Sequence, residues 1–317
     1  MALSNTARSD LLFVLVTLLA AISWMFSKEA VLLMPPMLFI AIRFLLGGLL
    51  LGAIGYRELR QLSREQCLRA IRVGLVFGLA MSCWSVGLHR IEHIGEGAFL
   101  TSLAVVLVPV MARLFFGETQ PASTWVSLPV AVAGLALLSL ENGFRLESGQ
   151  AFFIVAAALF ALYFNLNTHA AAARTVTDSG GTEHQERIPV IVLTAVVLTT
   201  VGVVSGALSF LLEPWHPTWR DFSWILAGWI LASTLVGTAG RFFVQTWAQS
   251  LSTHSHGVVI LVLEPVWVAL IAALWFAETM SSMQLAGCFM IFLALVINRW
   301  HPTQRWLRAM VTGAGSP

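Results

Sequence analysis

Two oppositely charged residues, Arg241 and Glu264, fall inside long apolar stretches of this sequence. At 1.5 Å per helical residue, Glu264 is roughly 10 Å and Arg241 roughly 12 Å from the end of its stretch. The short connector Gln249–His256 makes the two stretches antiparallel neighbours, so the charges should meet. We predict an ion pair for which a ligand carboxylate or a proton competes. A permanent structural salt bridge is the alternative.

Pro265 directly follows Glu264 and should make the backbone irregular at the acid. Proline has no N–H to donate, so the carbonyl of Leu261 is left without its helical partner. A helix broken beside an acid is typical of binding sites inside membranes. We therefore give Glu264 and Arg241 a binding or coupling role, and Pro265 a structural one.

Further candidates lie on other apolar stretches. Lys28 and Arg43 could attract an anion, but both could also reach lipid headgroups, and for Arg43 we favour that alternative. Aromatic and amide side chains could line a cavity, provide hydrogen bonds or make cation–π contacts, with helix packing as the alternative. These side chains are Trp24, Trp84, Tyr163, Trp247, Trp267, Asn165, Asn167, Gln245 and Gln249.

The composition excludes an ordinary soluble domain. Hydrophobic residues make up 58% of the 317 residues and charged residues 11%, whereas soluble domains are about a quarter charged. Thr119–Leu140 and Ile188–Leu212 are among the runs without any charge, and such runs predict membrane-spanning helices rather than the short alternating strands of a β-barrel. The net charge of +2 is too small to say anything about nucleic acid, and we expect no nucleic-acid partner. The three cysteines are widely spaced, so we expect no disulfide framework, no metal site and no cofactor.

The runs define an all-α membrane protein with ten spans. They are Leu11–Leu33, Met37–Ile54, Ala70–Leu88, Gly97–Phe116, Pro121–Leu140, Gln150–Thr168, Ile188–Leu212, Phe222–Ala248, Gly257–Ala277 and Met283–Asn298. If the N-terminus is cytoplasmic, twelve basic residues of the connectors, tails and span ends lie inside and four outside. The positive-inside rule therefore places both termini in the cytoplasm.

A repeated motif relates the two halves of the chain. Ala112–Thr119 reads ARLFFGET and Ala272–Thr279 reads AALWFAET, 160 residues later. We expect Glu118 and Glu278 to be structural, holding the turn into the next helix with help from threonine caps. With five spans in each half, residues 11–140 and 150–298 form two inverted repeats, and residues 299–317 form a cytoplasmic tail.

These features together resemble the drug/metabolite transporter superfamily, in particular its ten-helix EamA type. The resemblance rests on Trp24 with Lys28, the Pro35-Pro36 turn, Arg43 within IRFLLGGLLL, FLTSLAVVLVPV (Phe99–Val110), LEPVWVALIAALWFAET and the two FxET closures. It implies two inverted halves around a central cavity, and transport of small metabolites, often as export.

We therefore predict a secondary transporter of small organic metabolites, amino acids or related compounds among them, in a bacterial inner membrane. We expect proton- or exchange-driven export by alternating access, without an ATPase of its own because no Walker-type loop occurs. The protein should work as a monomer or homodimer, with lipid and a small-molecule substrate as partners. A flippase for a lipid-linked substrate is the alternative. A polytopic membrane enzyme is less favoured, because Glu264 is the one acid that we place deep within the membrane, whereas Glu29 lies near the end of its span.

Overall fold

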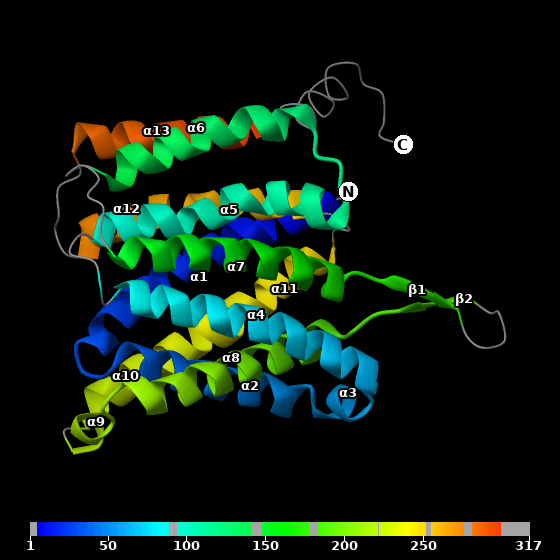
Figure 1. Ribbon diagram of the computed structural model, residues 1–317, viewed down its shortest axis with the longest axis vertical. Helices are drawn as coiled ribbons and strands as arrows, with labels where there is room; N and C mark the ends of the chain where they lie inside the picture. The colour runs from blue at the N-terminus through cyan, green and yellow to red at the C-terminus, as the bar shows by residue number, and fades with distance from the viewer. Residues whose placement is uncertain are drawn as a thin grey trace.

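The computed structural model describes residues 5–88, 90, 94–140, 148–177, 183–220, 222–251, 255–275 and 281–298. Helices make up nearly all of this part, and they lie roughly parallel or antiparallel in one bundle (Figure 1). The main helices are α1 (Asn5–Val31), α2 (Pro36–Ile54), α4 (Arg64–Leu88), α5 (Ile94–Phe116), α6 (Ala122–Ser139), α7 (Ser148–Ala171), α8 (Val190–Leu212), α10 (Trp224–Ala232), α11 (Arg241–Ser250), α12 (Glu264–Trp275) and α13 (Ser282–Asn298). Short helices α3 (Tyr56–Arg60) and α9 (His216–Arg220) lie in connectors.

Helical segments coincide with each predicted apolar stretch. In the described part of the chain, seven are long and apolar enough to cross a membrane, counting Trp224–Ser250 as one segment. Three more are apolar but shorter: Ala122–Leu138, Val258–Ile271 and Ser282–Asn298. The protein is therefore a multi-pass helical membrane protein.

Local capping explains where one helix boundary departs from the prediction. The third stretch was expected to begin at Ala70, but α4 begins at Arg64. Ser63 and Gln66 form a reciprocal capping box, in which each backbone N–H donates to the other's side-chain oxygen, at 3.0 and 3.2 Å. The cap therefore starts the helix more than one turn before the apolar run, and this additional turn is polar.

Two regular stretches of the sequence fold into irregular helices. The eighth stretch is an α-helix interrupted by a π-helix, η1 (Ser233–Gly240), before α11. The ninth opens as a 3-10 helix, η2 (Ser255–Leu263), and continues as α12. The predicted irregularity at Pro265 is therefore present, whereas the π-helix has no proline and was not anticipated. In η1, the hydroxyl of Thr238 donates to the carbonyl of Ser233, five residues back, at 3.1 Å.

Corresponding helices of the two halves run antiparallel. The amides of Met37 and Leu38, which open α2, donate to the carboxylate of Glu213, just after α8, at 2.9 Å each. At the other edge of the bundle, Ser123 Oγ, near the start of α6, donates to the carbonyl of Asn298, which ends α13, at 3.2 Å. Figure 1 shows α2 and α8 at one edge of the bundle and α6 and α13 at the other.

The first helices of the two halves also have opposite directions. Ser9, in the first turns of α1, donates its hydroxyl to the carbonyl of Ala248 at 2.9 Å. Arg187 donates to the carbonyls of Ala171, the last residue of α7, and Ser250, the last residue of α11. The start of α1 and the end of α7 therefore lie at the same end of the bundle, beside the end of α11.

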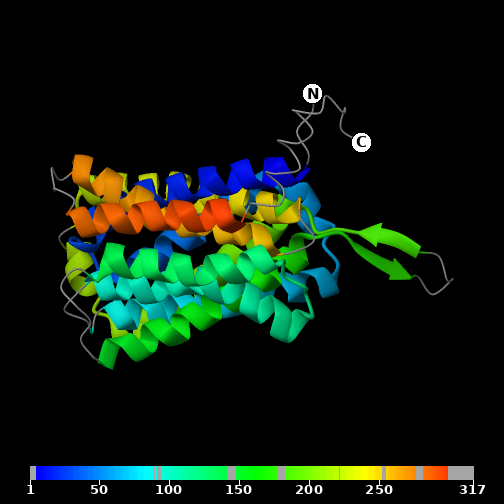
Figure 2. The ribbon, with the colours of Figure 1, turned by 90° about the horizontal axis from the view of Figure 1, so that it is seen from above.

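The connector between α7 and α8 contains a β-hairpin that the sequence did not reveal. Strands β1 (Arg174–Thr177) and β2 (Glu183–Glu186) pair antiparallel, with Arg174 opposite Glu186. The hairpin projects well beyond the helix ends (Figures 1 and 2). Its base is held to α4, because Gln66 donates to Glu186 at 2.9 Å.

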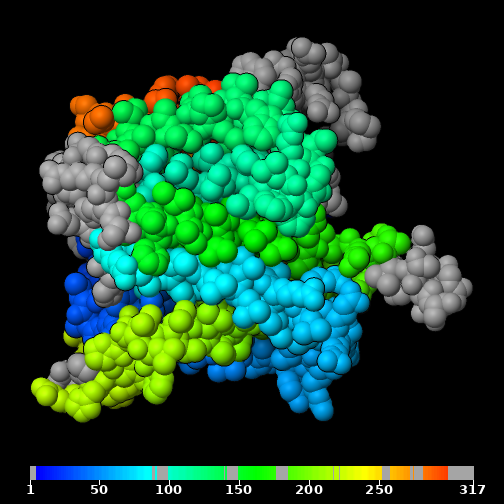
Figure 3. Space-filling model, viewed as in Figure 1, coloured from blue at the N-terminus to red at the C-terminus, as the bar shows by residue number. Residues whose placement is uncertain are grey.

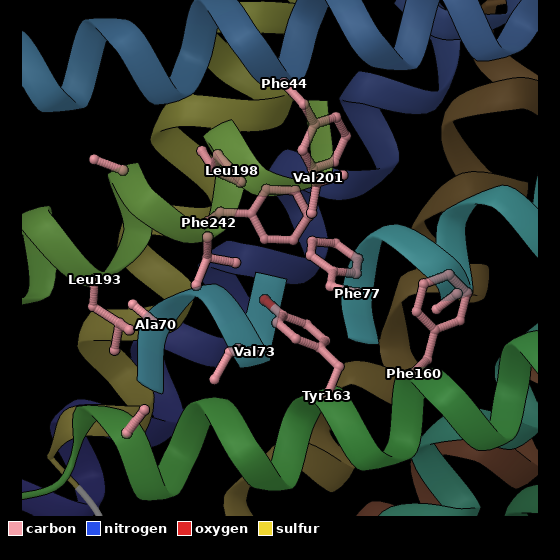
Figure 4. Packing of buried hydrophobic residues seen from close by; sticks show 14 of the residues in the cluster. Phe44, Ala70, Val73, Phe77, Phe160, Tyr163, Leu193, Leu198, Val201 and Phe242 are labelled. Carbon is pink, nitrogen blue, oxygen red and sulfur yellow. The ribbon is translucent and has the colours of Figure 1, made fainter. Parts of the chain in front are cut away.

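An aromatic cluster fills the centre between α2, α4, α7 and α11 (Figure 4). Phe77 stacks on Tyr163 with ring centroids 4.0 Å apart and planes 10° apart. Phe44 and Phe242 contact Phe77 edge-on, at 5.7 and 5.2 Å. Close packing of this kind fixes side-chain rotamers, so Tyr163 has a defined orientation toward α11.

Candidate functional site

The predicted contact between Arg241 and Glu264 is present. Arg241 Nη2 lies 3.0 Å from Glu264 Oε2, and the two side chains are 16% and 21% exposed. The second carboxylate oxygen, Oε1, accepts a hydrogen bond from Trp24 Nε1 at 3.2 Å. Trp24 belongs to α1 and the ion pair to α11 and α12, so one carboxylate joins three helices. Charge-assisted bonds of this kind are stronger than those between neutral groups.

Each charged residue of the pair follows an irregular helix directly. Arg241 is the first residue of α11, after the π-helix η1, and Glu264 is the first residue of α12, after the 3-10 helix η2. Inside α-helices, π-helical turns are rare and often accompany functional positions. The ion pair thus connects the two points at which the helices of the second half change their winding.

Trp84 supports Trp24 from α4. The two indole rings lie 5.8 Å apart at 76°, an edge-to-face contact. Trp267, three residues after Glu264 on α12, is half-buried, and its Nε1 has no hydrogen-bond partner among the described residues. The structure thus brings Trp24 and Trp84 together at the ion pair and places Trp267 one turn further along α12.

Arg43 is buried, so the expectation that it reaches lipid headgroups is wrong. Only 8% of Arg43 is exposed. Its guanidinium lies 5.2 Å from the ring centroids of both Phe39 and Phe44, and Nη1 donates to Ser27 Oγ at 2.9 Å. The guanidinium of Arg43 therefore contacts two aromatic rings and a hydroxyl instead of lipid headgroups. It does so because α2 orients this side chain toward α1 and away from lipid. Lys28, one turn above Trp24 on α1, is exposed, as the headgroup alternative requires.

Positive charge exceeds negative charge around this site. Two buried or largely buried guanidinium groups, Arg43 and Arg241, accompany one carboxylate, Glu264. The guanidinium of Arg241 lies 5.0 Å from the ring centroid of Phe242, and this ring contacts the Phe44 ring beside Arg43. The Nε atoms of Arg43 and Arg241 are buried and have no hydrogen-bond partner within the described ranges. Buried charges are normally paired, so an anionic group would complete this arrangement.

Tyr163 and the predicted amide residues join α7 to α11 beside the site. Gln245 Nε2 donates to Tyr163 Oη at 3.2 Å. Further toward the helix ends, Asn167 Nδ2 donates to Thr246 Oγ1 and to Gln249 Oε1. Gln245 and Gln249 are buried, as are Tyr163 and Asn167. Asn167 and Gln249 therefore join α7 to α11, and Gln245, one turn after Arg241 on α11, joins Tyr163 to the same helix.

The remaining predicted polar residues lie apart from the ion pair. Asn165 donates to the carbonyls of Val108 and Ala161, which binds α7 to α5. Trp247 is 45% exposed, and its ring contacts that of Phe243 on the same helix. The side chain of a residue two positions after Gln245 points away from it, because a helix turns by about 200° over two residues.

Glu118 contacts a partner that the sequence did not suggest. Its Oε1 lies 3.0 Å from His169 Nε2 at the end of α7, and the His169 ring stacks on Phe116. The expected cap by Thr119 is wrong, since Pro121 occupies the N-cap of α6 and no side chain caps it. Glu278 lies outside the described residues. In the described part, no group of three His, Cys, Asp or Glu could hold a metal ion.

Comparison with known proteins identifies the family. The model of the EamA-like transporter family matches residues 7–140 and again residues 147–300. The chain belongs to this family, within the drug/metabolite transporter superfamily. The Trp24–Glu264 hydrogen bond therefore crosses from the first matched segment to the second.

Related proteins are transporters by name. An uncharacterized transporter of Archaeoglobus fulgidus is 24% identical over 228 residues, which cover 71% of this chain and 67% of the length of that transporter. The uncharacterized transporter YvbV of Bacillus subtilis is 26% identical over 134 residues, 42% of this chain and only 44% of that protein. A probable 4-amino-4-deoxy-L-arabinose-phosphoundecaprenol flippase subunit, ArnE of Pseudomonas paraeruginosa, is 36% identical over 67 residues, 21% of this chain and 57% of its own.

A solved crystal structure shares the fold. It superposes with a TM-score of 0.73 and covers 92% of this chain and 96% of its own, at 18% sequence identity. This likeness extends over nearly the whole bundle, so the arrangement of helices that forms the site is an established one.

Proposed function

We propose that this EamA-like transporter is a secondary transporter that moves small organic metabolites by alternating access, with the Arg241–Glu264 pair at its substrate or coupling site. One observation carries the proposal. A charged pair, held by a tryptophan of the first family-matched segment, lies where two helices of the second segment change winding. Transporters with inverted repeats commonly bind substrate at discontinuous helices between the repeats.

The proposed architecture has ten spans in two inverted five-helix repeats, residues 11–140 and 150–298. The antiparallel contacts of α2 with α8 and of α6 with α13 support it, because inversion requires corresponding helices to run in opposite directions. Of the three shorter segments, Val258–Ile271 packs against α1 and α5, and Ala122–Leu138 and Ser282–Asn298 pair at one edge of the same bundle, which supports their crossing as well. Both termini are then cytoplasmic, in keeping with the distribution of arginine.

The charge balance favours a substrate with an anionic group, such as an amino acid or a related carboxylate. Arg43 and Arg241 would hold that group, and a substrate ammonium could approach Glu264. A substrate carboxylate that binds Arg241 competes with Glu264 for the same guanidinium. Proton uptake by Glu264 would weaken the pair in the same way, which offers a route for coupling to a proton gradient. Tyr163, Gln245, Trp84 and Trp267 complete the proposed site beside Trp24.

The irregular helices suggest how the site opens. The backbone hydrogen bonds of the π-helix η1 and the 3-10 helix η2 are less favourable than those of an α-helix. A change of helix type there would therefore move α11 and α12 at a low cost in free energy. Breaking the ion pair would release both helices together. We expect export from the cytoplasm across a bacterial inner membrane, as a monomer or homodimer. The named relatives in two bacteria agree with this location.

A lipid-linked substrate is the second candidate. The named flippase subunit is 36% identical over 67 residues, which is the observation that favours it. A membrane enzyme is not proposed, since the family and the named relatives are transporters.

Counterflow in proteoliposomes tests the proposal. A panel of labelled amino acids and small carboxylates is offered to wild type, Glu264→Gln, and Glu58→Gln as a control at an exposed glutamate of α3. We expect counterflow of at least one compound in wild type and the control, and at least a tenfold loss in Glu264→Gln. Equal counterflow in all three would refute the role of Glu264. Flipping of a lipid-linked sugar without metabolite flux would favour the second candidate, and chemical conversion of a lipid would indicate an enzyme.

A further inference from the structure

A groove of about 570 Å³ opens on the outer surface of the bundle, away from the ion pair. It is lined by α2, α3, α4 and α8, and α8 packs against both α2 and α4. Figure 3 shows α4 and α8 on the same face of the molecule. The rim is exposed, with Leu49 at 61% and Val203 at 58%. The groove therefore faces the bilayer in a multi-pass membrane protein.

The groove suits a hydrocarbon chain and not a polar metabolite. Nearly all of its lining is apolar, with Thr199 and Thr200 as hydroxyl residues on α8. Both hydroxyls already donate to carbonyls of their own helix, at 2.8 Å each. A polar solute would gain few hydrogen bonds there, whereas an acyl chain needs none.

The length of the groove matches one leaflet. Its lining on α8 runs from Ala195 to Val204, roughly 14 Å at 1.5 Å per residue. The hydrocarbon core of a bilayer is about 30 Å thick, so one leaflet accounts for about half of it. The groove ends at Tyr56 and Leu59 of α3, the short helix that follows the end of α2.

Positive charge lies at this end of the groove. The guanidinium of Arg60 sits 5.4 Å from the ring centroid of Tyr56, which lines the groove. Arg57 and Arg64 are exposed nearby in sequence, with Glu58 as the acid between them on α3. An excess of arginine at headgroup level attracts anionic lipids.

We propose that this groove binds one acyl chain of an anionic phospholipid, whose headgroup is held at α3 by Arg60. The lipid is a bound partner and not the transported substrate, so the proposal is independent of the ion pair. It depends on the shape of the groove and on the arginine at its end, and both can be changed separately.

Gly52 allows the groove to be filled without disturbing the helix contacts. A Cβ at Gly52 would lie 3.9 Å from the nearest atoms, those of Ala195 and Leu59, which is ordinary contact. A Cβ at Gly48 would instead lie 2.6 Å from the backbone of Thr199. Gly52→Leu therefore fills the groove, and Gly228→Leu is its matched control, because nothing lies within 4 Å of a Cβ there.

The test measures bound lipid by native mass spectrometry after exchange into phosphatidylglycerol and phosphatidylcholine with identical chains. We expect wild type and Gly228→Leu to retain phosphatidylglycerol at least fivefold more than phosphatidylcholine. Gly52→Leu should retain neither, and Arg60→Gln should retain both equally. Thermal unfolding without added lipid shows whether each variant is folded.

Several outcomes would overturn the proposal. Equal retention by wild type and folded Gly52→Leu would show that the groove holds no lipid. Equal retention of the two lipids by wild type would show that the groove does not select an anionic headgroup. An unchanged preference for phosphatidylglycerol in Arg60→Gln would show that Arg60 does not hold the headgroup, and this result refutes the proposal even if Gly52→Leu does not fold. A dimer that Gly52→Leu dissociates would assign the groove to a second copy of the chain.

Discussion

The indole of Trp24 donates a hydrogen bond of 3.2 Å to the carboxylate of Glu264, a residue 240 positions away in the chain. Because Arg241 binds the other oxygen of the same carboxylate, α1 is linked to the charged pair of the second half. A change in the ion pair would therefore alter a contact of α1, as the proposed alternating access between two halves requires.

Trp24→Phe should weaken this link while it keeps an aromatic ring against Trp84. A hydrogen bond to a charged group contributes about 1.5–3 kcal/mol, and 1.4 kcal/mol corresponds to about tenfold in an equilibrium. We therefore expect counterflow to fall by about tenfold, together with a loss of about 1.5–3 kcal/mol in the free energy of unfolding. Phe26→Leu on the same helix, away from Glu264, serves as the control. Unchanged counterflow in Trp24→Phe would show that the hydrogen bond has no part in transport.

Removing one member of the ion pair should destabilise the protein more than removing both. Arg241→Ala leaves a largely buried carboxylate, at a cost of up to about 3 kcal/mol in the free energy of unfolding. In the double variant with Glu264→Gln, the buried charge is gone and part of this loss should be recovered. Unfolding of detergent-solubilised protein measures the coupling of the two changes. Strictly additive losses would indicate that the pair contributes nothing to stability.

Gly237 in the π-helix permits close approach of α1. A Cβ at this position would overlap the hydroxyl of Ser23, which is buried. Gly237→Ala should therefore cost about 1–3 kcal/mol of stability through overpacking, and adding Ser23→Gly should restore most of it. Gly228→Ala, with open space around it, should change little. A loss in Gly237→Ala that Ser23→Gly does not rescue would argue against this contact.

The orientation of the chain can be tested at the β-hairpin. Single cysteines at Thr175, on β1, and at Arg90, in the connector before α5, are introduced into a variant without the native cysteines. If both termini are cytoplasmic, a membrane-impermeant maleimide should label Arg90→Cys in intact cells and Thr175→Cys only after permeabilisation. The reverse pattern would invert the proposed topology, and labelling of both positions from outside would contradict the assigned spans.

Much of this protein follows from the sequence alone, because helix length and depth depend on residues close together in the chain. Uncharged runs such as Ile188–Leu212 predict helices, since a backbone in lipid must satisfy its own hydrogen bonds. The rise of 1.5 Å per residue also placed Arg241 and Glu264 at the same depth. Their contact was predictable for this reason, as was the break at Pro265.

Only the tertiary structure decided which way each helix face points and which distant helix it meets. Arg43 could equally have faced lipid, and it is buried because α2 turns it between Phe39 and Phe44 and toward Ser27. Trp24 reaches Glu264 only because α1 packs against α12. A sequence records depth along a helix axis, whereas rotation about that axis and the choice of neighbour are set by packing of the whole bundle.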